Sequence, residues 1–417
     1  MHVVQFIHRY PPAVGGSESY TARLARDLAA RGHRSEVWTT TARHLGSFQS
    51  RAYPELPPGD TVEDGVTVRR FPLSHRWPGR RVLLKAASLV PVRPWQARVA
   101  PWMPLSRAMW RAAGADTVRP DVVHALAFPF GSMASCALRL ARRSRAKFVV
   151  TPFLHLGDPD DPNDPIRRAY TSAPLRWLIG HADRVLVQTP SEQAAAAGMG
   201  VRPERIVVQG MGVDAAECTG GNREAARRAW NVGPDEVVIG HLANLSPEKG
   251  SIDLMQAVQE VHHRRALIKL VLAGSAMPAF EDDWQRHGSS IPAVRLGPID
   301  DAEKRDFYAG IDVFALPSRS DSFGIVFLEA WANGVPVIGY RSGGVADLIR
   351  HGSDGLLVRC GDVEGLARAM EWLAEHPEER AARGAAGRAR VGSEFRWEDK
   401  LAIARGALMD WGRSAIE

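Results

Sequence analysis

Two carboxylates eight positions apart, Asp321 and Glu329, flank a segment that could hold an anionic ligand. The turn 322–324 between them opens an apolar run that predicts a helix. The first N–H groups of a helix lack partners within it and carry the positive end of its dipole, so they attract phosphate. Eight helical residues rise about 12 Å. The spacing therefore predicts a sugar-nucleotide site. The alternative is an acidic loop that caps a core helix, with Glu329 exposed to solvent on that helix.

The elements that must position these residues alternate between strand and helix in both halves of the chain. In the first half, a strand at 3–8, a glycine turn, a helix at 17–31 and a strand at 36–40 predict a βαβ unit. In the second half, a helix at 251–263 is expected between strands. The other expected strands are 122–123, 148–151, 184–188, 237–242, 267–273, 294–296, 313–316, 335–339 and 355–358. The pattern predicts an α/β fold of two Rossmann-like doubly wound domains that face a central cleft.

The domain boundaries follow from turn-rich sequence and from the last amphipathic stretch. We predict an N-terminal domain over 1–213 and a C-terminal domain over 214–395, which contains the segment 321–329. The segment 396–417 is expected to form a helix that packs back on the N-terminal domain.

Length and composition fit this organisation. A chain of 417 residues suggests about two domains. No apolar run reaches the roughly 18 residues that span a bilayer. The three cysteines are too widely spaced for a disulfide framework or a zinc site, which favours a reducing cytoplasm. The net charge of +6 favours anionic partners, yet no nucleic-acid-binding motif is present.

The basic charge is concentrated in residues 71–115. This stretch carries eight Lys and Arg residues and no acidic one, and tryptophans are interleaved with them: Trp77, Trp95, Trp102 and Trp110. Lys and Arg attract anionic lipid and Trp prefers the membrane interface. We therefore predict peripheral contact with an anionic membrane through 71–115, which would be the inner face of the cell membrane for a cytoplasmic protein. The alternative is a covered helical insert with an Arg-rich outer face.

The order of motifs resembles the family 4 retaining glycosyltransferases of the GT-B fold over nearly the whole chain. The most specific part, 317–344, is similar to the family's E-x7-E donor motif and the A-x-G-x-P-V-I and G-G signature that follows it. Supporting matches lie at 10–18, 208–214, 246–250 and 312–318. The resemblance implies transfer of a hexosyl group with retention of anomeric configuration. It also implies that the domain 1–213 binds the acceptor and that the domain 214–395 binds the nucleotide sugar.

The resemblance also implies roles for residues of the donor site. Glu329 would accept hydrogen bonds from the ribose hydroxyls. Asp321 stands where the family usually has glutamate beside the transferred sugar, and its side chain is one methylene shorter. The diphosphate and sugar would be held by the donor-binding residues Ser322, Phe323, Gly324, Ile325 and Val326.

A second set of residues is implied to carry charge and protons. Lys249 would neutralise the diphosphate leaving group, and Asn244 replaces the arginine that often accompanies it, with Arg319 as another source of positive charge. His155 would lie near the anomeric carbon and the acceptor. The catalytic set is thus His155, Asp321 and Lys249. Gly15, Gly16 and Ile299 complete the expected donor contacts. Each assignment has a structural alternative. Lys249 could be an exposed loop lysine, His155 a polar residue at a strand end, and Gly15-Gly16 a plain tight turn.

These expectations define an enzyme that needs no cofactor and no metal. Its donor would be GDP-mannose, UDP-glucose or UDP-N-acetylglucosamine, and its acceptor a hydroxyl of a glycolipid, a glycan or a secondary metabolite. Two alternatives stay open: a UDP-sugar 2-epimerase of the same fold, and a non-catalytic nucleotide-sugar-binding homologue. A Rossmann dehydrogenase is disfavoured because no G-x-G-x-x-G follows the first strand.

Overall fold

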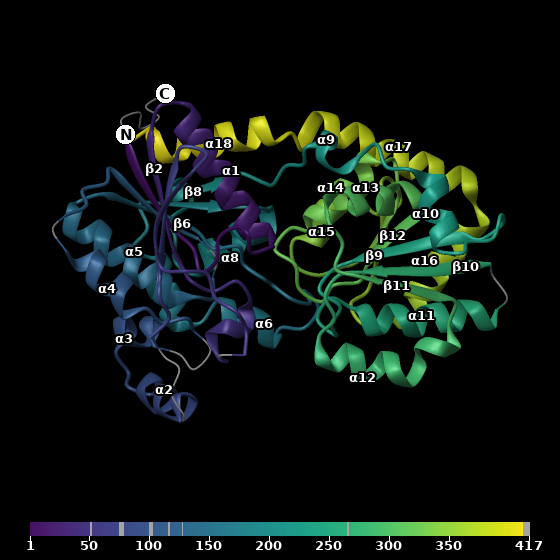
Figure 1. The fold of residues 1–417 in the computed structure, drawn as a ribbon, viewed down its shortest axis with the longest axis horizontal. Helices are drawn as coiled ribbons and strands as arrows, with labels where there is room; N and C mark the ends of the chain where they lie inside the picture. The colour runs from purple at the N-terminus through teal and green to yellow at the C-terminus, as the bar shows by residue number, and fades with distance from the viewer. Residues whose placement is uncertain are drawn as a thin grey trace. The chain divides into compact units, whose positions relative to one another are not determined.

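The computed structural model describes residues 1–50, 52–74, 79–99, 103–115, 117–126, 128–264 and 267–411. The chain divides into two compact α/β units (Figure 1). Unit 1 comprises Met1–Leu154, Arg167–Gln209 and Leu401–Glu417, and unit 2 comprises His155–Ile166 and Gly210–Lys400. Residues 155–166 thus group with unit 2, although the sequence places them in the domain 1–213.

Unit 1 is built on one eight-stranded sheet with the order β3-β4-β2-β1-β5-β6-β7-β8. All neighbouring strands are parallel except β3, which pairs antiparallel with β4. The strands are β1 His2–Phe6, β2 Arg34–Thr40, β3 Gly59–Glu63, β4 Val66–Phe71, β5 Val122–Leu126, β6 Lys147–Thr151, β7 Arg184–Val187 and β8 Ile206–Val208.

The helices of unit 1 pack along this sheet. Helix α1 packs on β2 and β4, α5 on β5, β1 and β6, and α8 on β7 and β8. The helices are α1 Gly16–Ala30, α2 Arg80–Ser88, α3 Arg93–Arg98, α4 Arg107–Gly114, α5 Gly131–Ser144, α7 Ala173–Ile179 and α8 Pro190–Gly198, with short 3₁₀ turns η1 Leu45–Phe48 and η2 Pro203–Arg205; α6 Pro165–Tyr170 crosses the boundary between the units.

Unit 2 contains an all-parallel six-stranded sheet with the order β11-β10-β9-β12-β13-β14. The strands are β9 Val237–Leu242, β10 Ile268–Ala273, β11 Ala293–Gly297, β12 Val313–Leu316, β13 Val337–Tyr340 and β14 Gly355–Val358. Its helices are α9 Ala215–Cys218, α10 Arg223–Ala229, α11 Ser251–His263, α12 Pro278–His287, η3 Gly288–Ser290, α13 Asp301–Gly310, α14 Ile325–Ala332, α15 Val345–Leu348, α16 Val363–Glu375 and α17 Pro377–Glu394.

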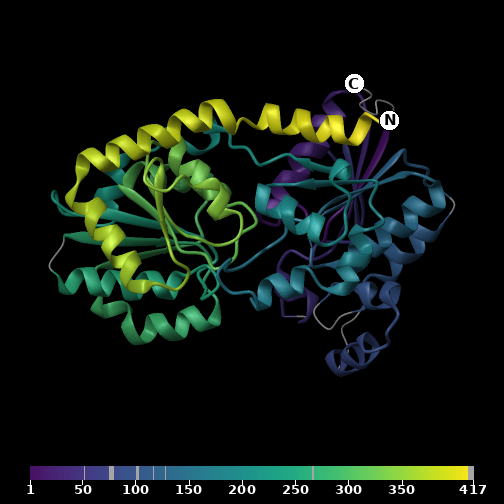
Figure 2. The same ribbon diagram turned by 180° about the vertical axis from the view of Figure 1, so that it is seen from behind.

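The last helix, α18 Trp397–Met409, begins in unit 2 and ends in unit 1; α17 and α18 are the long yellow helices of Figure 2. Its unit 1 end is held by ion pairs and hydrogen bonds. Arg405 pairs with Asp27 of α1 at 2.6 Å, and Arg184 donates to the carbonyl of Ala407 at 2.8 Å. These contacts hold the C-terminal part of α18 against α1 and β7.

The core of unit 2 explains why its strands are nearly continuous apolar runs. Strands of a parallel sheet are covered on both faces, so consecutive side chains, which point to opposite faces, are all buried. Leu270, Val271 and Leu272 are fully buried, as are Val313 and Phe314. Such a scaffold holds the loops that follow its strands in fixed positions.

The predicted fold class is confirmed in its two parallel α/β units. Strands and helices are found at the predicted places; α11 begins and ends at the predicted residues. The β3–β4 hairpin was not predicted, because β3 is an exposed edge strand without a buried stripe. No helix in the described part of the chain is long and apolar enough to cross a membrane.

Candidate functional site

The start of α14 presents uncapped backbone N–H groups, as the sequence predicts. Its N-cap residue is Gly324, with φ of 91°, and no side chain among the described residues caps the helix. By contrast, α13 begins with a full capping box from Asp300 and Glu303. The first N–H groups of α14, at Ile325 and Val326, are therefore suited to an anionic ligand.

Two glycines hold the loop before α14 by close backbone contact. Gly344 donates its N–H to the carbonyl of Asp321 at 2.8 Å. A Cβ on Gly344 would lie 2.0 Å from the carbonyl oxygen of Ser322, and one on Gly343 would lie 2.4 Å from that of Asp321. Because a side chain would clash with the backbone itself, the glycine pair fixes the position of residues 321–322.

Lys249 and Asp321 form an ion pair within unit 2. The Lys249 ammonium lies 2.9 Å and 3.0 Å from the two carboxylate oxygens of Asp321, and both side chains are partly buried. The structure thus brings together two of the three predicted catalytic residues. A diphosphate would compete with Asp321 for the same ammonium group.

His155 joins this cluster through Ser320. Its Nδ1 lies 3.2 Å from the Ser320 hydroxyl, which in turn donates to the Glu248 carboxylate at 2.7 Å. Burial lowers the pKa of His155, and the charge of Lys249 lowers it further, against the opposite effects of Asp321 and Glu248. The imidazole is therefore neutral near pH 7 and can accept a proton or a hydrogen bond.

Glu329 is anchored by two residues that sequence reasoning missed. Lys304 of α13 lies 3.2 Å from one carboxylate oxygen, and the Tyr308 hydroxyl donates to the other at 2.8 Å. Burial, the largest single effect, would lower the pKa of Lys304, but the charge and hydrogen bond of Glu329, together with Asp301, outweigh it and raise that pKa. Lys304 and Tyr308 lie four apart on one helix, a spacing that could have pointed to a shared partner.

The remaining donor-site predictions lie on loops and at the turn before α14. Asn244 is exposed after β9, and Ile299 is partly buried between β11 and α13. Phe323 is buried and meets the Phe395 ring edge-on at 6.1 Å, so its side chain is structural and only its backbone is available to a ligand. Arg319, the other expected source of positive charge, is paired with Asp253 at 2.5 Å.

The predicted glycine turn, Gly15 and Gly16, lies in unit 1 and depends on an unpredicted buried carboxylate. Glu18 lies 2.5 Å from Arg9 and 3.4 Å from His8. A Cβ on Gly15 would come within 2.3 Å of the Glu18 carboxylate. Burial alone would raise the pKa of Glu18, but His8 and then Arg9 outweigh it and lower that pKa to about 2.

A second buried carboxylate, Glu192, braces the chain just before His155. Its two oxygens accept from the backbone N–H groups of Leu154, at 2.7 Å, and Gln188, at 2.6 Å. Burial raises the pKa of Glu192 to about 8. The sequence signal was the Thr189-Pro190-Ser191-Glu192 pattern, which is typical of a helix N-terminus with a capping carboxylate.

Comparisons with known proteins agree with this architecture. The model described as "Glycosyl transferase 4-like domain" matches residues 15–212, and that described as "Glycosyl transferases group 1" matches 222–390. A D-inositol 3-phosphate glycosyltransferase of Kribbella flavida is 30% identical over 89% of this chain and 85% of its own length. A protein of the same name from Rhodococcus erythropolis is 31% identical, and that match covers 57% of this chain and 55% of the relative.

Solved structures share the fold at low identity. The sucrose-phosphate synthase of Thermosynechococcus elongatus superposes with a TM-score of 0.74 at 19% identity, over 97% of each chain. The Anabaena protein HepE, solved in complex with UDP and glucose, gives a TM-score of 0.71 at 19% identity, over 98% of this chain and 99% of that one.

Fold and matched models together define a glycosyltransferase with the GT-B fold. Within that class, the chain belongs to the group 1, family 4-like glycosyltransferases.

Gly344→Ala tests the close backbone contact. The new methyl group would clash with the Ser322 carbonyl, so we expect the free energy of unfolding to fall by about 2–4 kcal/mol. Chemical denaturation measures this change. The matched control is Gly392→Ala, because a Cβ there meets no atom within 4 Å. Equal stability of the two variants would contradict the packing described.

Glu18→Gln tests the buried ion pair through pH. The folded pKa of about 2 lies below the unfolded value of 4.5. The ionised carboxylate therefore stabilises the fold fully above pH 4.5, and this contribution is lost as the pH falls through 2. At pH 7 it amounts to on the order of 3 kcal/mol. Urea unfolding of both proteins between pH 2 and 7 should give curves that converge in acid, whereas a constant difference would refute the pairing.

Proposed function

We propose that this glycosyltransferase moves a hexosyl group from a nucleotide-diphosphate sugar to a hydroxyl acceptor with retention of anomeric configuration. The observation that carries the proposal is the arrangement around α14 in unit 2. An uncapped helix start follows the Lys249–Asp321 pair directly, and Glu329 lies in the same helix, held by Lys304 and Tyr308.

In the proposed mechanism, the diphosphate binds the N–H groups at the start of α14 and the Lys249 ammonium. Negative charge grows on the diphosphate as the bond to the sugar breaks. Donors already in place stabilise that charge without reorganisation, which is the main source of rate in such a site. Asn244 is exposed on the loop between β9 and α11 that also carries Lys249, and its side chain can add only a neutral hydrogen bond.

The sugar and ribose ends would be held by the two carboxylates. Glu329 keeps acceptor capacity beyond its bonds to Lys304 and Tyr308, because a carboxylate can accept about four hydrogen bonds. Asp321, released from Lys249, would accept from sugar hydroxyls. His155, neutral near pH 7, would contact the transferred sugar and the attacking hydroxyl.

We propose GDP-mannose, UDP-glucose or UDP-N-acetylglucosamine as donor, used without a metal ion, with the acceptor bound mainly by unit 1. The solved HepE complexes with UDP and with UDP-glucose support a uridine donor. The relatives named as D-inositol 3-phosphate glycosyltransferases support a polyol acceptor that bears phosphate. Reaction in the cytoplasm is part of the same proposal.

A thermal-shift panel of UDP, GDP, ADP and their common sugars, with and without Mg²⁺, tests the donor. A ligand that binds the native state raises the melting temperature as its occupancy rises. We expect one base family to raise it equally with and without Mg²⁺. A shift that needs Mg²⁺ would contradict metal independence, and no shift with any nucleotide would contradict the donor site.

Lys249→Ala and Glu329→Ala should each leave the fold intact and slow transfer. Loss of the Lys249 charge should reduce kcat by about 100-fold to 1,000-fold, the range for removal of one preorganised donor. Loss of Glu329 should chiefly raise KM for the donor. Release of nucleotide diphosphate measures both, with Lys147→Ala and Glu371→Ala as controls on the partly exposed surface. Full activity of both site variants would refute the assignment.

A further inference from the structure

An apolar patch lies exposed at one tip of unit 1. Within α2 and the turn after it, Val82 is 73% exposed, Leu83 59% and Leu89 71%. Val90 and Val92 continue the patch at 46% and 50%. We call these five residues the α2 tip. Soluble proteins rarely expose contiguous apolar side chains without an interaction to serve.

The described contacts of α2, the helix that carries this patch, are made by Leu84 and by the C-terminal end of the helix. Leu84 is buried, and the backbone carbonyls of Ala87 and Ser88 accept hydrogen bonds from Trp95 and Gln96 of α3. Val82 and Leu83 therefore face away from these contacts. Both ribbon views place α2 at the edge of unit 1, away from its sheet (Figure 1, Figure 2).

The surroundings of the α2 tip are strongly basic. Residues 71–115, which contain the α2 tip, carry eight Lys and Arg residues and no Asp or Glu. Lys85 and Arg93, which neighbour the α2 tip in the sequence, are exposed. Arg76, Trp77 and Trp102 lie outside the described residues, as do the side chains of Arg80 and Arg81.

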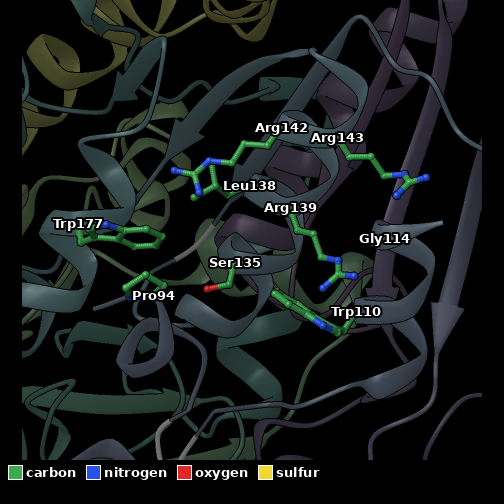
Figure 3. A pocket seen from close by; sticks show the side chains of 9 residues that line it. All are labelled: Pro94, Trp110, Gly114, Ser135, Leu138, Arg139, Arg142, Arg143 and Trp177. Carbon is green, nitrogen blue, oxygen red and sulfur yellow. The ribbon is translucent and has the colours of Figure 1, made fainter. Parts of the chain in front are cut away.

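The basic surface continues into an arginine-lined pocket of about 460 Å³ that borders α3. Figure 3 shows its residues: Pro94, Trp110, Gly114, Ser135, Leu138, Arg139, Arg142, Arg143 and Trp177. Arg139 lies over the Trp110 ring at 4.3 Å, and Arg98 lies over the same ring at 4.4 Å. The lining contains three guanidinium groups and no carboxylate.

Two of the tryptophans expected to reach a membrane are instead engaged by arginine. Trp95 is partly buried and contacted by Arg98, and Trp110 is contacted by the guanidinium groups of Arg98 and Arg139. In the described part of 71–115, the large apolar side chains that are exposed are those of the α2 tip. The basic stretch 71–115 thus combines an apolar tip with a cationic flank.

We propose that unit 1 docks on an anionic lipid bilayer, with the α2 tip inserted at the interface and the arginine pocket facing phosphate head groups. A bilayer supplies both features that the surface requires: an apolar layer beneath a negatively charged one. The proposal goes beyond the transfer reaction, since it concerns where the enzyme works. It does not depend on which nucleotide sugar is the donor.

Co-sedimentation of the full chain with vesicles tests the docking. We expect binding to vesicles of 30% phosphatidylserine in phosphatidylcholine at about 50 mM salt, and weaker binding at about 300 mM, because salt screens the cationic flank. Binding to pure phosphatidylcholine should be far weaker. The double variant V82D/L83D should lose at least about tenfold in partition coefficient, since two apolar side chains leave the interface.

The control is Val62→Asp, because Val62 is as exposed as Val82 but lies on β3, outside the patch. We expect it to bind as the native chain does, and nucleotide-induced melting shifts should be the same in all three proteins. No binding of the native chain at low salt would overturn the proposal, as would equal loss in Val62→Asp. A native chain that self-associates through the α2 tip, seen by light scattering and abolished in V82D/L83D without vesicle binding, would assign the patch to a second copy instead.

Discussion

The close approach of the Gly343–Gly344 backbone to residues 321–322 is the constraint on which the proposed donor site depends. It leaves no room for a Cβ at either glycine, and it fixes where the chain enters α14. The entry at Gly324 has a positive φ and no side-chain cap, so the N–H groups of the first turn stay available. Asp321 and Glu329 are then placed before and within the same short helix. The uncapped helix start, which we propose binds the diphosphate, is thus produced by backbone packing rather than by any one charged residue.

Charges in unit 2 are balanced around this helix start. Lys249 is matched by Asp321, and Glu329 by Lys304 with the Tyr308 hydroxyl. Partly buried charges are costly unless paired, so each pairing offsets the cost of holding a charged side chain inside the fold. The same pairings hold the side chains in one rotamer. A diphosphate that draws Lys249 away would leave Asp321 free for sugar hydroxyls, which couples binding at one end of the donor to the other.

The sequence predicted most of the parallel sheets, because buried strands are short apolar runs bounded by turn residues. The resemblance to the family 4 glycosyltransferases also implied that 321–329 and Lys249 belong to one site. The sequence could not reveal that Lys304 and Tyr308 pair with Glu329, or that Glu18 pairs with Arg9, because tertiary packing chooses the partner of a carboxylate. The four-residue spacing of Lys304 and Tyr308 points to a shared partner but does not name it. The hairpin β3–β4 was not predicted because its outer strand, β3, is exposed and does not alternate between buried and exposed residues. The stacking of Trp95 and Trp110 with arginine side chains is likewise set by tertiary packing, so the sequence of 71–115 did not predict it.

Hydrogen exchange of the backbone amides at 323–326 tests the central claim most directly. The full chain would be measured alone and with the nucleotide diphosphate that raises its melting temperature. If the diphosphate binds the start of α14, exchange at Phe323, Gly324, Ile325 and Val326 should slow on binding, while the exposed β3 strand exchanges as before. A nucleotide that stabilises the protein yet leaves these four amides unchanged would contradict the site and place the donor elsewhere.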